Sequence, residues 1–207
     1  MARASGSADP NAAWEAAIPA GVPYIHADPA LVEKWRGEFD RRAGKRSPCR
    51  VAIAWQGSSA YRMDHFRSMP LSFFAPLAKI RGVELISIQK GPGSEQIKQV
   101  DFPVVDLGDE LDSASGAFMD TAAIMTVVDL VITSDTVIPH LAGALGVPVW
   151  MATPFIPDWR WLLDREDSPW YPTLRLFRQT EIGVWDNVFQ RLAAALEKRV
   201  REAKKTP

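Results

Sequence analysis

The sequence predicts an α/β protein built on a parallel β-sheet of about six strands, with helices on both faces of the sheet. Short apolar runs, mostly of β-branched residues, recur from residue 50 onward, and segments with helical periodicity lie between them. Connections of that length join parallel strands, because a tight turn joins only antiparallel ones.

Each expected element can be placed along the chain. The strand runs are 50–55, 83–88, 103–108, 128–134, 147–152 and 173–178. The helical patterns are 71–80, 94–99, 118–127, 137–145 and 158–163, with a closing helix at 184–200. No internal repeat of fixed period is visible, and the alternation matches a single Rossmann-like domain over residues 49–203.

The residues before the first strand are expected to lead into this domain. Residues 1–20 are expected to be a disordered tail or linker, because about the first 12 are small and polar and show no periodicity. Residues 21–48 are expected to be an extended, proline-punctuated segment followed by an amphipathic helix over 30–44 that ends at Gly44.

Composition restricts the kind of partner and the compartment. The 207 residues carry a formal net charge of −1 and a pI of about 6.3, so no basic field is available to hold a nucleic acid or an anionic membrane. No apolar run approaches the length of a membrane span. Cys49 is the only cysteine, which excludes an internal disulfide and a thiolate zinc site and favours an incidental thiol in a reducing cytoplasm.

Parallel sheets bind ligands at the carboxyl ends of their strands, so the loops at that edge hold the candidate residues. The loop after the first strand contains Gly57, which lets the backbone approach an anion, and Arg67, whose guanidinium can fork onto phosphate. Gln89 and Lys90 follow the second strand, where a lysine can serve as a point charge for phosphate. An exposed polar loop and a surface lysine would explain the same residues.

The fourth strand ends at Ser134, and Ser134, Asp135 and Thr136 each suit a helix N-cap. Pro139 fits the first turn of a helix but not its interior, so the helix is expected to start between residues 135 and 138. His140 then lies within the first two turns, near a ligand at the positive end of the helix dipole. Alternatively, Asp135 is a plain cap and His140 is a half-buried packing residue.

The segment 157–171, after the fifth strand, is rich in aromatic residues. Trp159, Trp161, Trp170 and Tyr171 lie there among acidic and basic side chains. These rings could stack on a planar base or sugar, or they could seal the end of the sheet or contact another domain.

The pattern S-D-T-x-x-x-H-L-A-G-A-L-G-x-P-V at 134–149, followed by D-W-R-W-L-L and by S-P-W-Y-P-T at 168–173, resembles the C-terminal half of a bacterial glycosyltransferase. The similar type is often fused behind tetratricopeptide repeats. It is related to the ADP-heptose transferases of lipopolysaccharide synthesis and, more distantly, to the protein O-GlcNAc transferases. The resemblance runs from about residue 22 to about residue 200.

This resemblance implies the GT-B architecture, in which two Rossmann-like domains face each other across a cleft and the C-terminal one binds a nucleotide-sugar donor. It implies that Asp135, Thr136 and His140 meet the donor's diphosphate and sugar, and that Arg67 clamps a phosphate. The expected donor-binding set is completed by Gly57, Gln89, Lys90, Asp120, Thr121 and Ser134. Val137 departs from the pattern, since heptosyltransferases carry a glycine after the Asp-Thr pair.

The resemblance also implies what else the activity needs. The nucleotide-diphosphate sugar is a substrate, and no metal or other cofactor is expected because the sequence has no D-x-D motif. In relatives an N-terminal domain supplies the acceptor site and usually the catalytic base, so no catalytic residue is assigned in this chain. Besides the nucleotide sugar, the expected partner is an N-terminal portion with a Rossmann-like domain and tetratricopeptide repeats, or a second copy of this chain bound through the Trp-rich segment 157–171.

Two other functions remain to be weighed. The chain could be a non-catalytic interaction module that retains the glycosyltransferase fold and uses segment 157–171 as its interface. A nicotinamide-binding dehydrogenase is disfavoured, because no G-x-G-x-x-G motif follows any strand.

Overall fold

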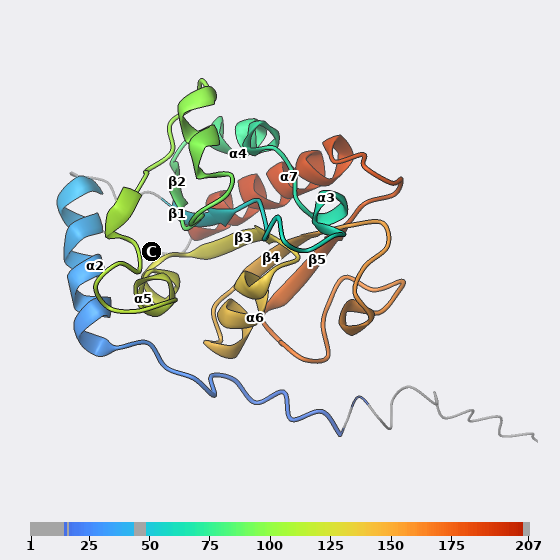
Figure 1. Cartoon of the computed structure of the whole chain (residues 1–207), viewed down its shortest axis with the longest axis horizontal. Coiled ribbons are helices and arrows are strands. Elements are labelled where there is room, and N and C mark those ends of the chain that lie inside the picture. The colour runs from blue at the N-terminus through green and yellow to red at the C-terminus, as the bar shows by residue number, and fades with distance from the viewer. Residues whose placement is uncertain (1–14, 16, 44–48, 205–207) are drawn as a thin grey trace, which may run out of the picture.

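A sheet of five parallel strands in the order β2-β1-β3-β4-β5 forms the centre of the molecule (Figure 1). The computed structural model describes residue 15 and residues 17–43 and 49–204. The strands are β1 (Cys49–Ala54), β2 (Val83–Ser87), β3 (Leu130–Ser134), β4 (Val149–Thr153) and β5 (Leu174–Arg178). The predicted α/β class with a parallel sheet is confirmed.

Helices and 3₁₀ turns connect the strands at nearly all of the predicted places. The longer helices are α2 (Pro29–Ala43), α5 (Met119–Val127), α6 (Val137–Ala144) and α7 (Asp186–Ala203). The shorter ones are α3 (Asp64–Arg67), η1 (Leu71–Phe74), α4 (Ala75–Ala78), η2 (Ser94–Gln99), η3 (Gly108–Glu110) and η4 (Trp159–Trp161). The predicted helix end at Gly44 and most of the predicted tail lie outside the described residues.

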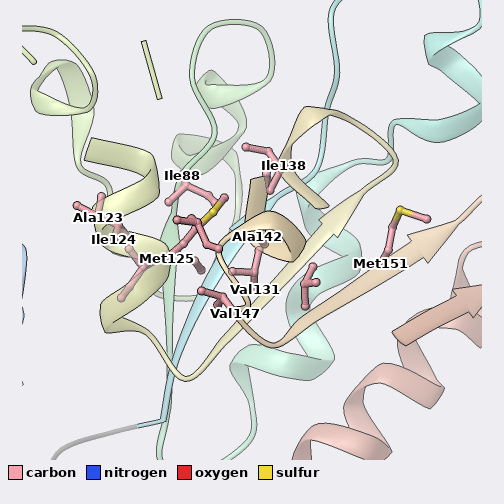
Figure 2. Packing of buried hydrophobic residues seen from close by; sticks show 14 of the residues in the cluster. Ile88, Ala123, Ile124, Met125, Val131, Ile138, Ala142, Val147 and Met151 are labelled. Atoms are coloured by element: carbon pink, nitrogen blue, oxygen red, sulfur yellow. The ribbon is translucent and has the colours of Figure 1, made fainter. Parts of the chain in front are cut away.

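Side chains that alternate along each strand divide the core into two layers. In β1, Ala52 and Ala54 face the layer of α5 and α6, whereas Val51 and Ile53 face the layer of α4 and α7. Figure 2 shows the first layer, in which Ile124 of α5 and Ala142 of α6 belong to one cluster with β-strand residues. Helix α2 adds Trp35 and Phe39 to that layer and packs beside α5 (Figure 1).

The predicted strand at 103–108 is reduced to a single bridge between Val105 and Ile86 at the outer edge of β2. The Val105 N–H donates to the Leu85 carbonyl, and the Val105 carbonyl accepts from the Ser87 N–H. Pro103 has no N–H to extend the ladder, and the chain turns away at Gly108, whose φ is +55°. The sheet therefore has five strands rather than about six.

The strand order identifies the edge at which a ligand site is expected. From β1 the chain moves outward to β2 on one side and then returns to build β3, β4 and β5 on the other. In open parallel sheets, a crevice forms where the order reverses in this way, outside the carboxyl ends of the strands. That point lies between β1 and β3.

Candidate functional site

A cavity of about 550 Å³ opens at the carboxyl ends of β1, β2 and β3, at the point where the strand order reverses. Six of the predicted donor-site residues line it: Gly57, Arg67, Gln89, Lys90, Thr121 and Thr136. Four others are not among its lining residues: Asp120, Ser134, Asp135 and His140. The topology thus brings together loops that follow three different strands, as the sequence predicted.

Arg67 is held on two sides at the edge of this cavity. Its Nε donates to Asp64 Oδ1 at 2.9 Å, and its Nη1 donates to the backbone carbonyl of Asp135 at 2.8 Å. The guanidinium also lies over the Tyr61 ring, 4.4 Å from the ring centroid. Arg67 therefore ties the loop after β1 to the loop after β3.

Gly57 lies directly against this ion pair. A β-carbon at position 57 would stand 2.2 Å from Asp64 Oδ1 and 2.8 Å from Arg67 Nη2, so a larger residue would displace both groups. The Gly57 N–H donates to the Ser68 hydroxyl at 2.9 Å. The Gly57 N–H was expected to bind an anion, but it binds the Ser68 hydroxyl instead. The absence of a side chain at Gly57 allows Asp64 and Arg67 to approach the backbone closely.

Gln89 joins the loops after β1 and β2. Its Oε1 accepts from the N–H groups of Trp55 and Gln56, both at 3.0 Å. Its Nε2 donates to the carbonyls of Gln56 at 3.0 Å and Pro92 at 2.9 Å. Because these four bonds occupy the amide, Gln89 shapes the cavity wall.

Lys90 brings a positive charge to the same wall. Its ammonium donates to the backbone carbonyl of Leu111, which is neutral, so this contact does not cancel the charge. Lys90 lies in the loop after β2, and Leu111 follows η3. The charge thus remains available to an anionic ligand in the cavity.

The start of α6 faces the cavity with Thr136 and Val137. Thr136 is the N-cap, and its hydroxyl accepts from the Ile138 N–H at 3.2 Å. The helix begins at Val137, within the predicted range, and Pro139 occupies its third position. Since proline has no N–H, this helix start offers an anion fewer free donors than an ordinary one.

Asp135 is buried behind the cavity. Burial is the main cause that raises the pKa of its carboxyl, and the nearby Asp158 carboxylate raises it further. The Trp161 indole N–H and the Arg67 charge oppose the rise, although the indole geometry falls short of a hydrogen bond. The Ser134 side chain is also buried, and its hydroxyl has no partner among the described residues.

His140 faces the aromatic segment and not the cavity. Its Nδ1 lies 3.1 Å from the Tyr171 hydroxyl, and its ring stacks on Trp161 with centroids 5.0 Å apart. Burial lowers the pKa of His140, and the charge of Arg160 lowers it further while Asp158 opposes. The structure thus gives His140 the half-buried packing position that was its alternative interpretation.

Thr121 and Asp120, neighbours at the start of α5, point in different directions. The Asp112 carboxylate accepts from both the Thr121 N–H at 3.1 Å and the Thr121 hydroxyl at 2.6 Å. The Asp120 carboxylate turns toward α2 and accepts from the Trp35 indole at 2.7 Å. Burial raises the Asp120 pKa, but hydrogen bonds from Ser115 and Trp35, with the Lys34 charge, outweigh it and lower the pKa.

The sequence-based set lacks several residues of the site, among them Asp64, Asp112 and Phe118. Asp64 stands one helical turn before Arg67, a spacing that could have indicated an ion pair. Phe118 is 43% exposed, has a φ of +64° and belongs to the apolar wall of the cavity. No local pattern marks Asp112 or Phe118, because their roles depend on how the loop 108–118 folds over the sheet edge.

Some rings of the Trp-rich segment seal the end of the sheet, as one interpretation predicted, and others remain exposed. Trp161 is fully buried against α6, and Tyr171 is half-buried, so these rings seal the end of the sheet. Trp159 is 65% exposed and Leu163 is exposed as well, as are Phe155 and Ile156 just before the segment. The segment therefore anchors itself with some aromatic rings and leaves other apolar side chains at the surface.

Two further observations concern metal binding and membrane-spanning helices. Across residues 17–43 and 49–204, no three His, Cys, Asp or Glu side chains come together as metal ligands would. Within the same part of the chain, no helix combines the length and apolar character needed to span a bilayer.

Comparisons with known proteins support the fold. No family model matches the chain. Protein FlbA of Caulobacter vibrioides is 30% identical over 185 residues, which cover 87% of this chain and 30% of FlbA. The ADP-heptose lps heptosyltransferase II of E. coli superposes with a TM-score of 0.58 and 14% identity, over 87% of this chain and 54% of that one. The glycosyl transferase family 9 protein of Veillonella parvula superposes with a TM-score of 0.59 and 14% identity, over 86% of this chain and 53% of that one.

These values establish the architecture and its extent. The chain has the α/β fold of a heptosyltransferase-like, GT-B glycosyltransferase domain. It spans about half the length of these solved glycosyltransferases and less than a third of FlbA. At 14% sequence identity the likeness concerns the fold, so the activity has to be argued from the site.

Proposed function

We propose that this chain is the donor-binding domain of a glycosyltransferase and that a nucleoside diphosphate sugar binds in the cavity at the carboxyl ends of β1, β2 and β3. The convergence of Arg67, Lys90 and the start of α6 on that one cavity carries the proposal. Each brings positive potential from a different loop, and a diphosphate is the common ligand that would use all three.

The apolar part of the cavity lining suits the nucleoside. It consists of apolar side chains and one exposed aromatic ring: Ile88, Pro92, Ala117, Phe118 and Ile138. A planar base gains by packing on such a surface, and Phe118 offers a ring for stacking. The volume of about 550 Å³ lies within the range of small-molecule sites, which is about 300–1,000 Å³.

The proposed chemistry is direct attack of an acceptor hydroxyl on the anomeric carbon of the sugar. The bond between that carbon and the diphosphate oxygen breaks, and negative charge develops on the leaving nucleoside diphosphate. Arg67 and Lys90, both lining the cavity, would stabilise that charge, a role that needs no metal in this scheme. The hydroxyl proton has no acceptor assigned in this chain, so the base belongs to a further domain.

The surface around the cavity supports the proposal of a further domain. Exposed large apolar side chains lie in segments that follow the carboxyl ends of the strands: Tyr61, Met63, Phe66, Phe118, Met119, Val137, Phe155, Ile156, Trp159, Leu163, Ile182 and Val184. Exposed apolar patches of this kind mark contact surfaces. An N-terminal Rossmann-like domain, with tetratricopeptide repeats before it, would supply the acceptor site there.

A cytoplasmic location is part of the same proposal. Burial raises the pKa of the Cys49 thiol to about 11, so this thiol is protonated and inert at neutral pH. An inert single thiol fits a reducing compartment.

Isothermal titration calorimetry of the full chain with UDP, GDP and ADP tests the function. At least one of them is expected to bind, and Lys90→Met is expected to weaken that binding about tenfold, since a charge-assisted contact is worth about 1.5–3 kcal/mol. Lys98→Met, which removes an exposed lysine in η2, is the matched control and should leave affinity unchanged. If the folded chain binds none of the three nucleotides, the proposal is wrong.

The exposed apolar residues at 155–163 favour one alternative, a non-catalytic module that binds a protein partner or a second copy. Sedimentation equilibrium of the wild type and of Trp159→Ser would detect self-association through this segment. Association that depends on Trp159, together with the absence of nucleotide binding, would favour the interaction module.

A further inference from the structure

Asp64 is a buried carboxylate next to Arg67. Among the described residues, its only ion pair is with Arg67. We propose that Asp64 is a positioning residue for the donor diphosphate: it holds Arg67 so that the free edge of the guanidinium points into the cavity. This inference rests on the proposed function, because it assigns a role within the same donor site.

Asp64 makes its contacts with both carboxylate oxygens. Oδ1 accepts from Arg67 Nε at 2.9 Å, and Oδ2 accepts from the Ser68 hydroxyl at 2.6 Å. Ser68 in turn accepts from the Gly57 N–H at 2.9 Å. The carboxylate, 7% exposed, is therefore fixed by α3 and by the loop after β1 before any ligand binds.

The guanidinium of Arg67 is planar, so two contacts on different edges define its plane. Asp64 binds Nε, and the Asp135 carbonyl binds Nη1. The Nη2 group lies over Gly57, in the wall of the cavity, where a β-carbon would be only 2.8 Å away. Two edges of the arginine thus meet the protein, and Nη2 remains for a phosphate oxygen.

A preoriented arginine binds a phosphate with less loss of side-chain freedom than a mobile one. Asp64 also lowers the net charge at this point, which by itself would weaken the attraction of a diphosphate. Lys90, whose partner is a carbonyl, adds a positive charge that Asp64 does not cancel. The orientation that Asp64 gives to Arg67 therefore has to outweigh the charge that Asp64 cancels, and this balance can be measured.

The experiment is a double-mutant cycle on the full chain by calorimetry, and its two probes are inorganic pyrophosphate and whichever of UDP, GDP and ADP binds the wild type. The variants are Asp64→Asn, Arg67→Met and the double variant. Asp64→Asn is expected to weaken the binding of both probes about tenfold and to have no further effect in the Arg67→Met background. Glu33→Gln, which breaks the exposed ion pair of Glu33 with Arg36 in α2 at the same spacing, is the control and should change nothing.

A ligand-independent measurement separates positioning from a general loss of structure. In ¹⁵N spectra the Arg67 Nε–H should be protected from solvent exchange in the wild type and lose that protection in Asp64→Asn, while the backbone amide spectrum stays unchanged. Ser68→Ala keeps both charges and removes one bond to Asp64, so it serves if Asp64→Asn does not fold. It is expected to weaken pyrophosphate binding about threefold.

The outcomes distinguish this inference from the proposed function. If the wild type binds neither pyrophosphate nor any of UDP, GDP and ADP, both are overturned. If it binds them and Asp64→Asn binds equally well or more tightly, the positioning role is overturned and the donor site stands. Additive effects of Asp64→Asn and Arg67→Met also overturn it, because a residue that acts through Arg67 has no effect once Arg67 is gone.

Discussion

The Tyr171 ring packs so closely against Gly143 of α6 that a β-carbon at position 143 would stand 2.3 Å from Tyr171 Cγ. His140, one turn earlier in α6, meets the hydroxyl of the same tyrosine at 3.1 Å. The spacing of this histidine and glycine therefore produces a packing surface for the Trp-rich segment. The motif that carries the resemblance to glycosyltransferases faces the cavity only through Thr136, Val137 and Ile138.

Gly143→Ala is expected to destabilise the protein by about 1–3 kcal/mol, the usual cost of inserting a methyl group into a packed site. Gly37→Ala is the matched control, because Gly37 lies in the middle of α2 with nothing within 4 Å of its β-position. That control should stabilise the protein by about 0.5–1 kcal/mol, as glycine weakens a helix interior. Urea denaturation measures both, and equal effects would contradict the packing role of Gly143.

His140→Gln is expected to reduce the acid sensitivity of folding. Burial lowers the folded-state pKa of His140 below its ordinary value of 6.5, so the unfolded chain binds the proton more readily. The wild type therefore loses stability as the pH falls from about 7 through 6.5 toward the folded pKa, and the variant lacks that contribution. Thermal unfolding at pH 7.5, 6.5 and 5.5 checks this, with the exposed His26→Gln as a control that keeps the wild-type pH dependence.

Asp120→Ala is expected to destabilise the protein by about 1–3 kcal/mol, because it leaves the buried Trp35 indole without its acceptor. It is also expected to leave pyrophosphate affinity unchanged, since the Asp120 carboxylate faces α2 and not the cavity. Urea denaturation and calorimetry give the two results, and Asp109→Ala, an exposed neighbour in η3, controls for charge. A lower pyrophosphate affinity would return Asp120 to the donor site.

Phe118→Gly should separate ligand binding from stability. Phe118 has a φ of +64°, a conformation that costs a non-glycine residue about 1–3 kcal/mol, so glycine should leave stability unchanged or raise it. Loss of the ring should weaken binding of whichever nucleoside diphosphate the wild type binds about tenfold, because stacking of one base is worth about 1–3 kcal/mol. Pyrophosphate, which has no base, should bind as to the wild type, and a parallel loss of both ligands would contradict the stacking role.

Local sequence signals predicted most of the fold and the correct edge of the sheet. Pro139 and the polar residues before it located the start of α6, and the apolar runs located all five strands. The expected strand at 103–108 shortened to a bridge because an edge run with Pro103 and Gly108 cannot sustain a ladder. The loops after β1, β2 and β3 were expected to meet, and they do so around one cavity.

The sequence by itself determined the alternation of strands and helices and the loops at the ligand edge, because periodicity and proline signals act between near neighbours. Only the tertiary structure decided which side chains of those loops reach the cavity. Asp120 accepts a hydrogen bond from the Trp35 indole, which is 85 residues away in the sequence, and His140 contacts Tyr171, which is 31 residues away in the sequence. A side chain's direction at such a site depends on partners that arrive only when distant segments pack, so the same motif can bind a ligand or hold the protein together.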